Sequence, residues 1–161
     1  MRLVLISDTH LPHRGRDLPP AVWEAVESAD VVIHAGDWVD IALLDDLQAR
    51  SARLVGCWGN NDGPALRERL PERADVTLAG VRFTVVHETG AAAGREARMA
   101  ARYPDTDVLV FGHSHIPWDT HAAGLRLLNP GSPTDRRRQP FCTYMTADVD
   151  GSVGEVTLHR L

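Results

Sequence analysis

Short apolar runs with strand character alternate with helical segments through the first two-thirds of the chain, and this alternation constrains the fold most strongly. The expected strands in the first part are Arg2–Ser7, Val31–His34 and Arg53–Cys57, and the expected helices are Pro20–Ser28, Ile41–Arg50 and Pro64–Leu70. Pro19 and Pro20 fit a helix start, because the N–H that proline lacks is unused there. Alternation of this kind is typical of a sheet with helices packed against it.

Strands dominate the rest of the chain. The expected elements there are a hairpin of Val76–Leu78 and Val81–His87, a helix Ala91–Tyr103, a strand Val108–Phe111, and two further hairpins, Trp118–Ala122 with Leu125–Asn129 and Thr143–Val149 with Val153–His159. Strand–helix alternation followed by a run of strands predicts an α/β protein with two sheets packed face to face and helices outside. In such folds ligands bind beyond the carboxyl ends of the strands.

Composition fits one compact domain spanning residues 1–161, since 43% of the residues are hydrophobic and can form a core. We expect a cytoplasmic protein with no membrane partner: no apolar run approaches the roughly 20 residues of a membrane helix, and the first strand is too short for a signal peptide. The net charge of -5 argues against a long nucleic-acid partner. Cys57 and Cys142 are too few for a disulfide framework, so we expect two buried thiols.

Metal-binding side chains follow the expected strands in five short segments. These segments are Asp8-Thr9-His10, Gly36-Asp37, Gly59-Asn60-Asn61-Asp62, His87 and Gly112-His113-Ser114-His115. In extended chain, residues i and i+2 point to the same side, so Asp8 and His10 are expected to converge, as are His113 and His115. The glycines at the start of three segments are expected to let the backbone turn sharply, so that the next side chain faces the site.

Carboxylate, imidazole and amide ligands together suit borderline divalent ions. We expect two ions per chain, Mn²⁺ first, with Ni²⁺, Fe²⁺, Co²⁺, Zn²⁺ or Mg²⁺ as alternatives. Two such ions, the carboxylates of Asp8 and Asp37, and a bridging hydroxide leave a charge of about +1. That balance favours an anionic phosphate substrate over a neutral amide.

The five segments, in this order, together with the turn Asn129-Pro130-Gly131-Ser132, resemble the calcineurin-like metallophosphoesterase superfamily, and within it the small YfcE-type phosphodiesterase branch. The resemblance covers nearly the whole chain and implies a four-layer αββα sandwich of two mixed β-sheets, with a dinuclear metal site at one edge. It implies that the first ion is held by Asp8, His10 and His115, the second by Asn60, His87 and His113, and both by Asp37.

Two positions depart from the family pattern. Many members carry a histidine directly after the metal-binding asparagine, where it assists the leaving group, and this chain has Asn61 there. The YfcE-type branch often lacks that histidine, so the departure agrees with membership of that branch. The family usually has glycine after the histidine at position 87, and this chain has Glu88, which is expected to alter the second metal site.

The resemblance implies hydrolysis of small phosphate esters, diesters foremost, by in-line attack of a hydroxide that bridges the two ions. The residues assigned to the reaction are Asp37, Asn60, Asn61, Asp62 and His113. A phosphomonoesterase is one alternative, and a non-catalytic protein-interaction scaffold, the role of a retromer subunit that resembles this family, is another. Because all seven ligand positions hold competent ligands, an enzyme is favoured. A homo-oligomer, dimer or tetramer, remains open.

Several neighbouring residues have two interpretations. Asp62 either orients a ligand or the substrate, or caps the helix that starts near Pro64. His34, inside a strand, is interpreted as a core histidine, and Trp38 as a packing residue rather than a platform for an aromatic leaving group. The run Arg136-Arg137-Arg138 is interpreted as a solvated loop rather than a phosphate-binding group.

Overall fold

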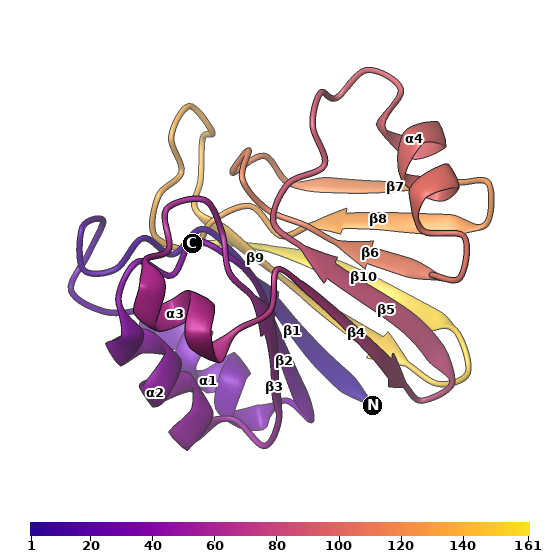
Figure 1. Cartoon of the computed structure of the whole chain (residues 1–161). Coiled ribbons are helices and arrows are strands. Elements are labelled where there is room, and N and C mark those ends of the chain that lie inside the picture. The colour runs from indigo at the N-terminus through magenta and orange to yellow at the C-terminus, as the bar shows by residue number, and fades with distance from the viewer.

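A computed structural model describes all 161 residues of the chain. Its strands are β1 (Arg2–Ile6), β2 (Val31–Ala35), β3 (Leu54–Cys57), β4 (Arg73–Leu78), β5 (Val81–Val86), β6 (Val108–Val110), β7 (Trp118–Ala122), β8 (Leu125–Asn129), β9 (Thr143–Val149) and β10 (Val153–Arg160). Its helices are α1 (Pro20–Ser28), α2 (Ile41–Arg50), α3 (Pro64–Arg69) and α4 (Arg95–Arg102). The first sheet has the strand order β10-β9-β1-β2-β3 and the second sheet β4-β5-β6-β8-β7 (Figure 1).

Three apolar clusters hold four layers together. Strand β1 shows how the period of two builds them: Leu3 and Leu5 face the second sheet, whereas Val4 and Ile6 face the helices. One cluster fills the space between the two sheets, one lies between the first sheet and α1–α3, and a smaller one lies between the second sheet and α4. The expected αββα sandwich of two mixed sheets is therefore confirmed.

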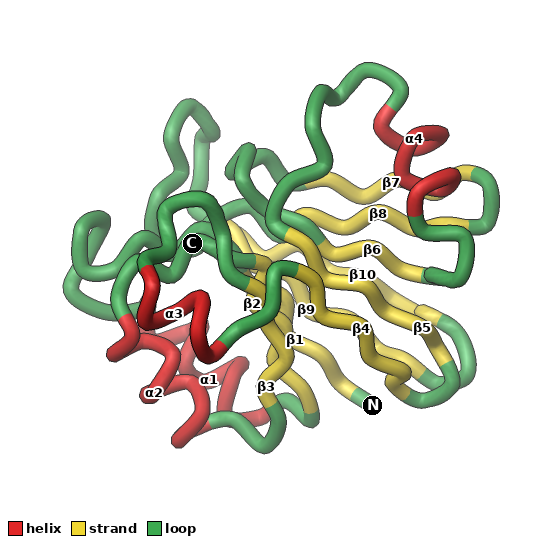
Figure 2. Tube along the Cα trace, viewed as in Figure 1, coloured by secondary structure: helices red, strands yellow, loops and turns green.

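The parallel strands of both sheets end at the same edge of the molecule. In the first sheet β1, β2 and β3 are mutually parallel, and in the second sheet β5, β6 and β8 are. Figure 2 shows that long loops follow the ends of these strands. The five ligand-bearing segments begin one or two residues after the ends of β1, β2, β3, β5 and β6, so the topology brings them to one place.

Strand β3 begins one residue later than the sequence pattern predicts, and two other elements begin further from their predicted starts. Strand β4 starts at Arg73 rather than Val76, because its polar first half pairs in register with the end of β5, from Arg73 opposite Val86 onwards. Helix α4 starts at Arg95 rather than Ala91. The alanines before it form a loop whose carbonyl groups accept hydrogen bonds from the guanidinium of Arg98.

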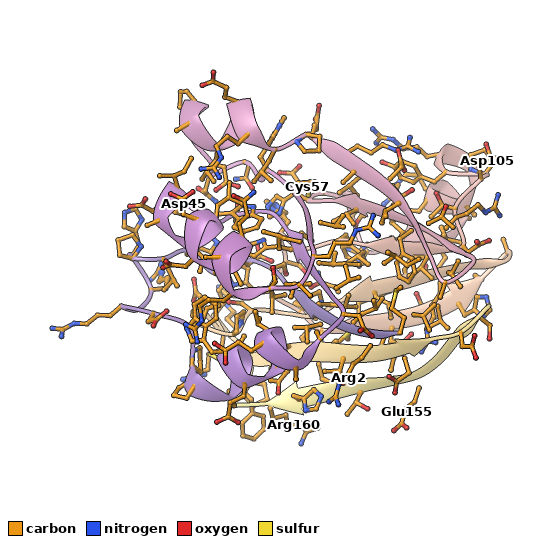
Figure 3. The ribbon with its side chains drawn as sticks, turned by 90° about the horizontal axis from the view of Figure 1, so that it is seen from below. Arg2, Asp45, Cys57, Asp105, Glu155 and Arg160 are labelled. Atoms are coloured by element: carbon orange, nitrogen blue, oxygen red, sulfur yellow. The ribbon has the colours of Figure 1, made fainter.

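The cysteines differ in burial. Cys57, at the end of β3, is fully buried and lies inside the molecule in Figure 3, whereas Cys142 is only half-buried, so the expectation of two buried thiols is wrong for Cys142. The same view shows Glu155 and Arg160 projecting outward from β10. No helix in the structure combines the length and the apolar character needed to cross a membrane.

Candidate metal centre

Two overlapping groups of ligand atoms lie at the carboxyl edge of the sheets. Asp8, His10 and His115 form one group, and Asp8, Asp37 and His87 form the other. Within each group all ligand atoms lie within 4.8 Å of one another. Atoms at this spacing can bind a common ion, and Asp8 is shared between the two groups.

Asp37 and Asn60 complete the arrangement. The Oδ2 atom of Asp37 lies 3.3 Å from Nε2 of His10 and 3.3 Å from Nε2 of His87, between the two groups. The Oδ1 atom of Asn60 lies 3.0 Å from Nε2 of His87 and 3.1 Å from Nδ1 of His113. The structure thus brings together all seven residues predicted to bind metal, with Asp37 in the position of a bridge.

The backbone reaches this geometry differently from the sequence expectation. Five of the ligands have left-handed backbone: Asp8 (φ 55°), His10 (φ 47°), Asp37 (φ 60°), His113 (φ 70°) and His115 (φ 59°). The argument that i and i+2 converge because the chain is extended is therefore wrong, although the side chains do converge. Left-handed conformations cost non-glycine residues free energy, and their concentration at one site is typical of functional positions.

The glycines beside the ligands also act in two ways. Gly36 has a φ of 88°, which fits the expected sharp turn. At Gly112, a Cβ would lie 2.7 Å from Oδ2 of Asp8, so this glycine is required by close approach rather than by a turn. Gly59 is similar, since a Cβ there would collide with the carboxylate and the backbone nitrogen of Asp37.

Backbone carbonyl groups orient two of the imidazoles. Nδ1 of His87 donates a hydrogen bond to the carbonyl of Ala35 at 2.8 Å, and Nδ1 of His115 donates to the carbonyl of Asp135 at 2.5 Å. This leaves Nε2 of each ring directed at the site. The Nε2 atoms of His115 and His10 are buried without a hydrogen-bond partner. Buried polar atoms rarely lack a partner, so these two nitrogens fit a bound cation.

Electrostatics lead to the same conclusion. Burial raises the pKa of Asp8 to about 7, and it lowers the pKa of His115 to about 4. Burial also acts on Asp37, but the imidazoles of His10 and His87, each 3.3 Å from its Oδ2 atom, hold the pKa of that carboxyl well below its usual range. For His87 burial is outweighed by Asp37 and Asp8, which bring the imidazole pKa to about 9. A divalent cation would stabilise both buried carboxylates without a proton on His87.

Asp62 supports the loops that carry the ligands. Its Oδ2 accepts hydrogen bonds from the backbone N–H groups of Asp37 (3.0 Å) and Gly59 (2.7 Å), and its Oδ1 accepts one from Val39 (2.7 Å). The helix after it, α3, has Gly63 at its N-cap and no side-chain cap. Of the two interpretations, the structure supports orientation of a ligand loop and excludes helix capping. The buried carboxylate faces backbone groups, so contact with the substrate is not what it provides.

Asn61 differs from its expected placement. Its side-chain Nδ2 donates to Oδ2 of Asp37 at 2.7 Å, and its backbone N–H donates to Oδ1 of the same residue at 2.9 Å. The family histidine at this position is expected to face the leaving group. In this chain the amide is instead engaged with Asp37, so Asn61 positions the bridging carboxylate.

The turn Asn129-Pro130-Gly131-Ser132 lies behind the first metal group. Ser132 Oγ donates to the backbone carbonyl of Asp8 at 2.7 Å, and Ser7 Oγ donates to Asp8 Oδ2 at 2.8 Å. Asn129 Nδ2 donates to the carbonyl of Gly112 at 3.0 Å. Sequence reasoning missed Ser7 and the carbonyl of Asp135. Ser7 could have been found from its place directly before Asp8, whereas a backbone acceptor has no sequence signal.

His113 lies at the exposed side of the centre. Its Nδ1 is 3.6 Å from Oε1 of Glu88, and its carbonyl accepts a hydrogen bond from Arg137 at 3.2 Å. Glu88 therefore lies beside the second group of ligands. Arg136, Arg137 and Arg138 are all exposed, as expected for a solvated loop, and Arg137 contacts the site through this one hydrogen bond.

His34 and Trp38 are packing residues, as expected. His34 is fully buried, accepts a hydrogen bond from the N–H of Gly36, and stacks on Trp38 with 3.6 Å between ring centroids. The indole N–H of Trp38 donates to the carbonyl of Cys57. Neither ring is available to a substrate.

Comparison with known families agrees with this geometry. The family model for the calcineurin-like phosphoesterase superfamily domain matches residues 1–152. The chain belongs to this family. Family membership and the ligand residues together indicate a site for a divalent metal ion, which agrees with the unpartnered imidazole nitrogens.

Relatives of this calcineurin-like phosphoesterase cover most of its length. A probable metallophosphoesterase of Methanocaldococcus jannaschii is 36% identical over 93% of this chain and 77% of its own length. A phosphodiesterase of the same organism is 25% identical over 91% of this chain and 87% of its own. Vps29 of Entamoeba histolytica, solved in complex with Zn²⁺, matches 100% of this chain and 98% of its own with a TM-score of 0.79 at 21% identity, which shows similarity of fold.

Proposed function

We propose that this protein is a phosphodiesterase that hydrolyses small phosphate esters with two divalent ions, Mn²⁺ first among them. The observation that carries the proposal is the overlap of two ligand groups at Asp8, with the carboxylate of Asp37 between the buried imidazoles of His10 and His87. The relative named a phosphodiesterase supports diesters as the substrate class.

The residues of this chain would divide the work between binding and orientation. Bound ions would supply an activated water and bind the phosphoryl oxygens. Asp8 and Asp37 provide the negative charge that holds those ions, and the carbonyl groups of Ala35 and Asp135 fix two imidazoles in the tautomer that exposes Nε2. Asn61 and Asp62 hold Asp37 in place through its side chain and its backbone.

The test is a panel of esters assayed with metal-free protein and with added ions. Protein stripped by exhaustive chelation should not hydrolyse bis(p-nitrophenyl) phosphate, and Mn²⁺ should be among the ions that restore the activity. The monoester p-nitrophenyl phosphate should be hydrolysed more slowly. Full activity of the stripped protein would contradict the proposal, and faster hydrolysis of the monoester would contradict the diester assignment.

The scaffold alternative predicts a different result. It predicts that elemental analysis detects bound metal in a protein that hydrolyses no ester. The full ligand set and the cleft beside it, described below, favour turnover.

A further inference from the structure

A cleft of about 640 Å³ opens directly beside the metal centre. Asn60 and His87 form part of its lining, so a molecule in the cleft contacts the second ligand group. Three arginines also line it, Arg67, Arg73 and Arg102. A volume of this size is in the range of pockets that hold nucleotide-sized ligands.

The arginines come from three separate elements and are held against aromatic rings. Arg67, on α3, lies with its guanidinium 4.1 Å from the ring centroid of Trp58 and donates from Nε to the carbonyl of Asp62. Arg73, at the start of β4, and Arg102, at the end of α4, lie 4.9 Å and 5.5 Å from the ring of Tyr103 (elements in Figure 1). Stacking on a ring reduces the freedom of a guanidinium and presents its N–H groups edge-on.

Two of these charges are not neutralised within the chain. Arg67 and Arg102 form no ion pair with a carboxylate, whereas Arg73 pairs with Asp75 at 2.8 Å. Glu72 and Glu88 also line the cleft. Because Asp75 already neutralises Arg73, the charges of Arg67 and Arg102 balance those of Glu72 and Glu88, and the lining is close to neutral in a chain whose net charge is -5. Arginine forks match the geometry of phosphate oxygens, so the cleft suits an anionic group of the substrate.

We propose that this cleft is a subsite for a second phosphate group, so that the substrate is a short nucleotide-type diester with a further terminal phosphate. The proposal rests on the phosphodiesterase function proposed above. The scissile diester would lie at the metal centre, and the terminal phosphate would contact Arg102 and Arg67. The half-buried ring of Trp58 gives the wall apolar surface for the sugar or base between the two phosphates.

The test compares the dinucleotide ApA with the same dinucleotide carrying a terminal phosphate at its 5′ or its 3′ end. All three contain the same scissile linkage. The wild-type protein, loaded with Mn²⁺, should prefer one of the phosphorylated forms by about tenfold in kcat/KM, the effect of one charge-assisted contact. Arg102→Gln should remove most of that preference, and Arg102→Lys should retain part of it.

Arg53→Gln is the matched control, because Arg53 is exposed directly before β3, at the end of the strand away from the metal centre, and forms no side-chain hydrogen bond or ion pair. This variant should keep both the activity and the preference of the wild type. Hydrolysis of bis(p-nitrophenyl) phosphate is measured in parallel. If the wild type hydrolyses this ester but shows no preference among the dinucleotides, or if Arg102→Gln keeps the full preference, the subsite is overturned while the proposed function stands. If the ester is not hydrolysed at all, the proposed function is overturned and the subsite with it.

Discussion

Asp37 belongs to one of the two ligand groups and also lies beside a histidine of the other. Its Oδ2 lies between the imidazoles of His10 and His87 and also accepts a hydrogen bond from Asn61. Replacing this carboxylate by an amide of the same size removes a charge that two ions would share. The role of this residue can therefore be tested with little change in shape.

Asp37→Asn should lower turnover by orders of magnitude, because the bridging charge contributes to holding both ions. The fold should survive, and the bound metal per chain should fall. Turnover of bis(p-nitrophenyl) phosphate and elemental analysis check the two expectations. His34→Gln is the control: that side chain is buried and stacked on Trp38, so its loss should mainly lower stability. Near-normal turnover of Asp37→Asn would show that the bridging assignment is wrong.

Asn61 leads to a prediction about leaving groups. An amide does not titrate near neutral pH, and here it is bonded to Asp37 rather than directed outward. The leaving oxygen then departs without help from this residue, so the rate should fall steeply as the leaving-group pKa rises. Plots of log turnover against leaving-group pKa for a series of diesters measure the slope. A shallow wild-type slope would mean that another group protonates the leaving oxygen.

Asn61→His tests the same position in the opposite direction. With saturating metal, an imidazole there should flatten the slope, and general-acid assistance is worth at most about 10²–10⁴-fold for poor leaving groups. The structure adds a cost, because the variant loses the amide bond to Asp37. More metal should therefore be needed for half-maximal activity, and a metal titration measures this.

Residue identities at the site could be predicted, whereas their backbone conformation could not. The ligands were found because Asp, His and Asn follow strands in a recurring pattern. The left-handed φ of His10 or His115 is imposed by contacts with other segments, such as the bond from the His115 ring to the carbonyl of Asp135. Those contacts join residues far apart along the chain or involve backbone atoms, and neither leaves a local signal.

At the scale of elements, the loop after β3 is tied to the loop after β2 by Asp62. This carboxylate accepts three backbone N–H groups from Asp37, Val39 and Gly59. Burial raises the pKa of Asp62, because the three hydrogen bonds only partly compensate the carboxylate for its lost hydration. One side chain therefore fixes the loops at the ends of β2 and β3 relative to each other.

Asp62→Asn should destabilise the fold by roughly 2 kcal/mol, because an amide offers one acceptor oxygen and places its NH₂ against a backbone donor. Metal affinity should fall as well, since the Asp37 loop is no longer fixed. Denaturant unfolding and a metal titration measure the two effects. Asp46→Asn, on the exposed side of α2, is the matched control and should change neither. Equal stability of the two variants would contradict the role given to Asp62.

The position of α4 shows where element prediction fails. Alanines favour helix, and Ala91–Tyr103 has helical composition, but Arg98 binds three carbonyl groups of the preceding loop and holds residues 89–93 out of the helix. The early strands were easier to predict, because continuous apolar runs such as β1 are buried on both faces whatever their neighbours are.

At the scale of the whole molecule, the metal centre joins the two sheets. Asp8, Asp37 and Asn60 follow strands of the first sheet, whereas His87 and His115 follow strands of the second. A bound ion would therefore link the sheets at one edge, and it would bind the folded chain only. By mass action such an ion raises the free energy of unfolding.

The pH dependence of stability should consequently differ between metal-free and metal-loaded protein. In the metal-free fold the pKa of His87 is about 9, above the usual 6.5, and that of Asp8 is about 7, above 3.8. The folded chain then binds more protons than the unfolded chain between pH 6.5 and 9, so its stability should fall as pH rises through this window, by about 3 kcal/mol at most. The lowered pKa values of His34 and His115 act only below pH 6.5.

Metal loading should remove this decline, because His87 bound to an ion carries no proton to lose. Denaturant unfolding at pH 6.5, 7.5 and 9, with chelator or with a saturating divalent ion, measures both curves. Metal should also bind more tightly as pH rises, because below pH 9 the ion must displace the proton of His87. Metal-free stability that rises with pH across this window would mean that His87 is neutral in the folded chain. The imidazole would then be ready for metal at any pH above its ordinary pKa, and the two carboxylates would have to be stabilised in another way.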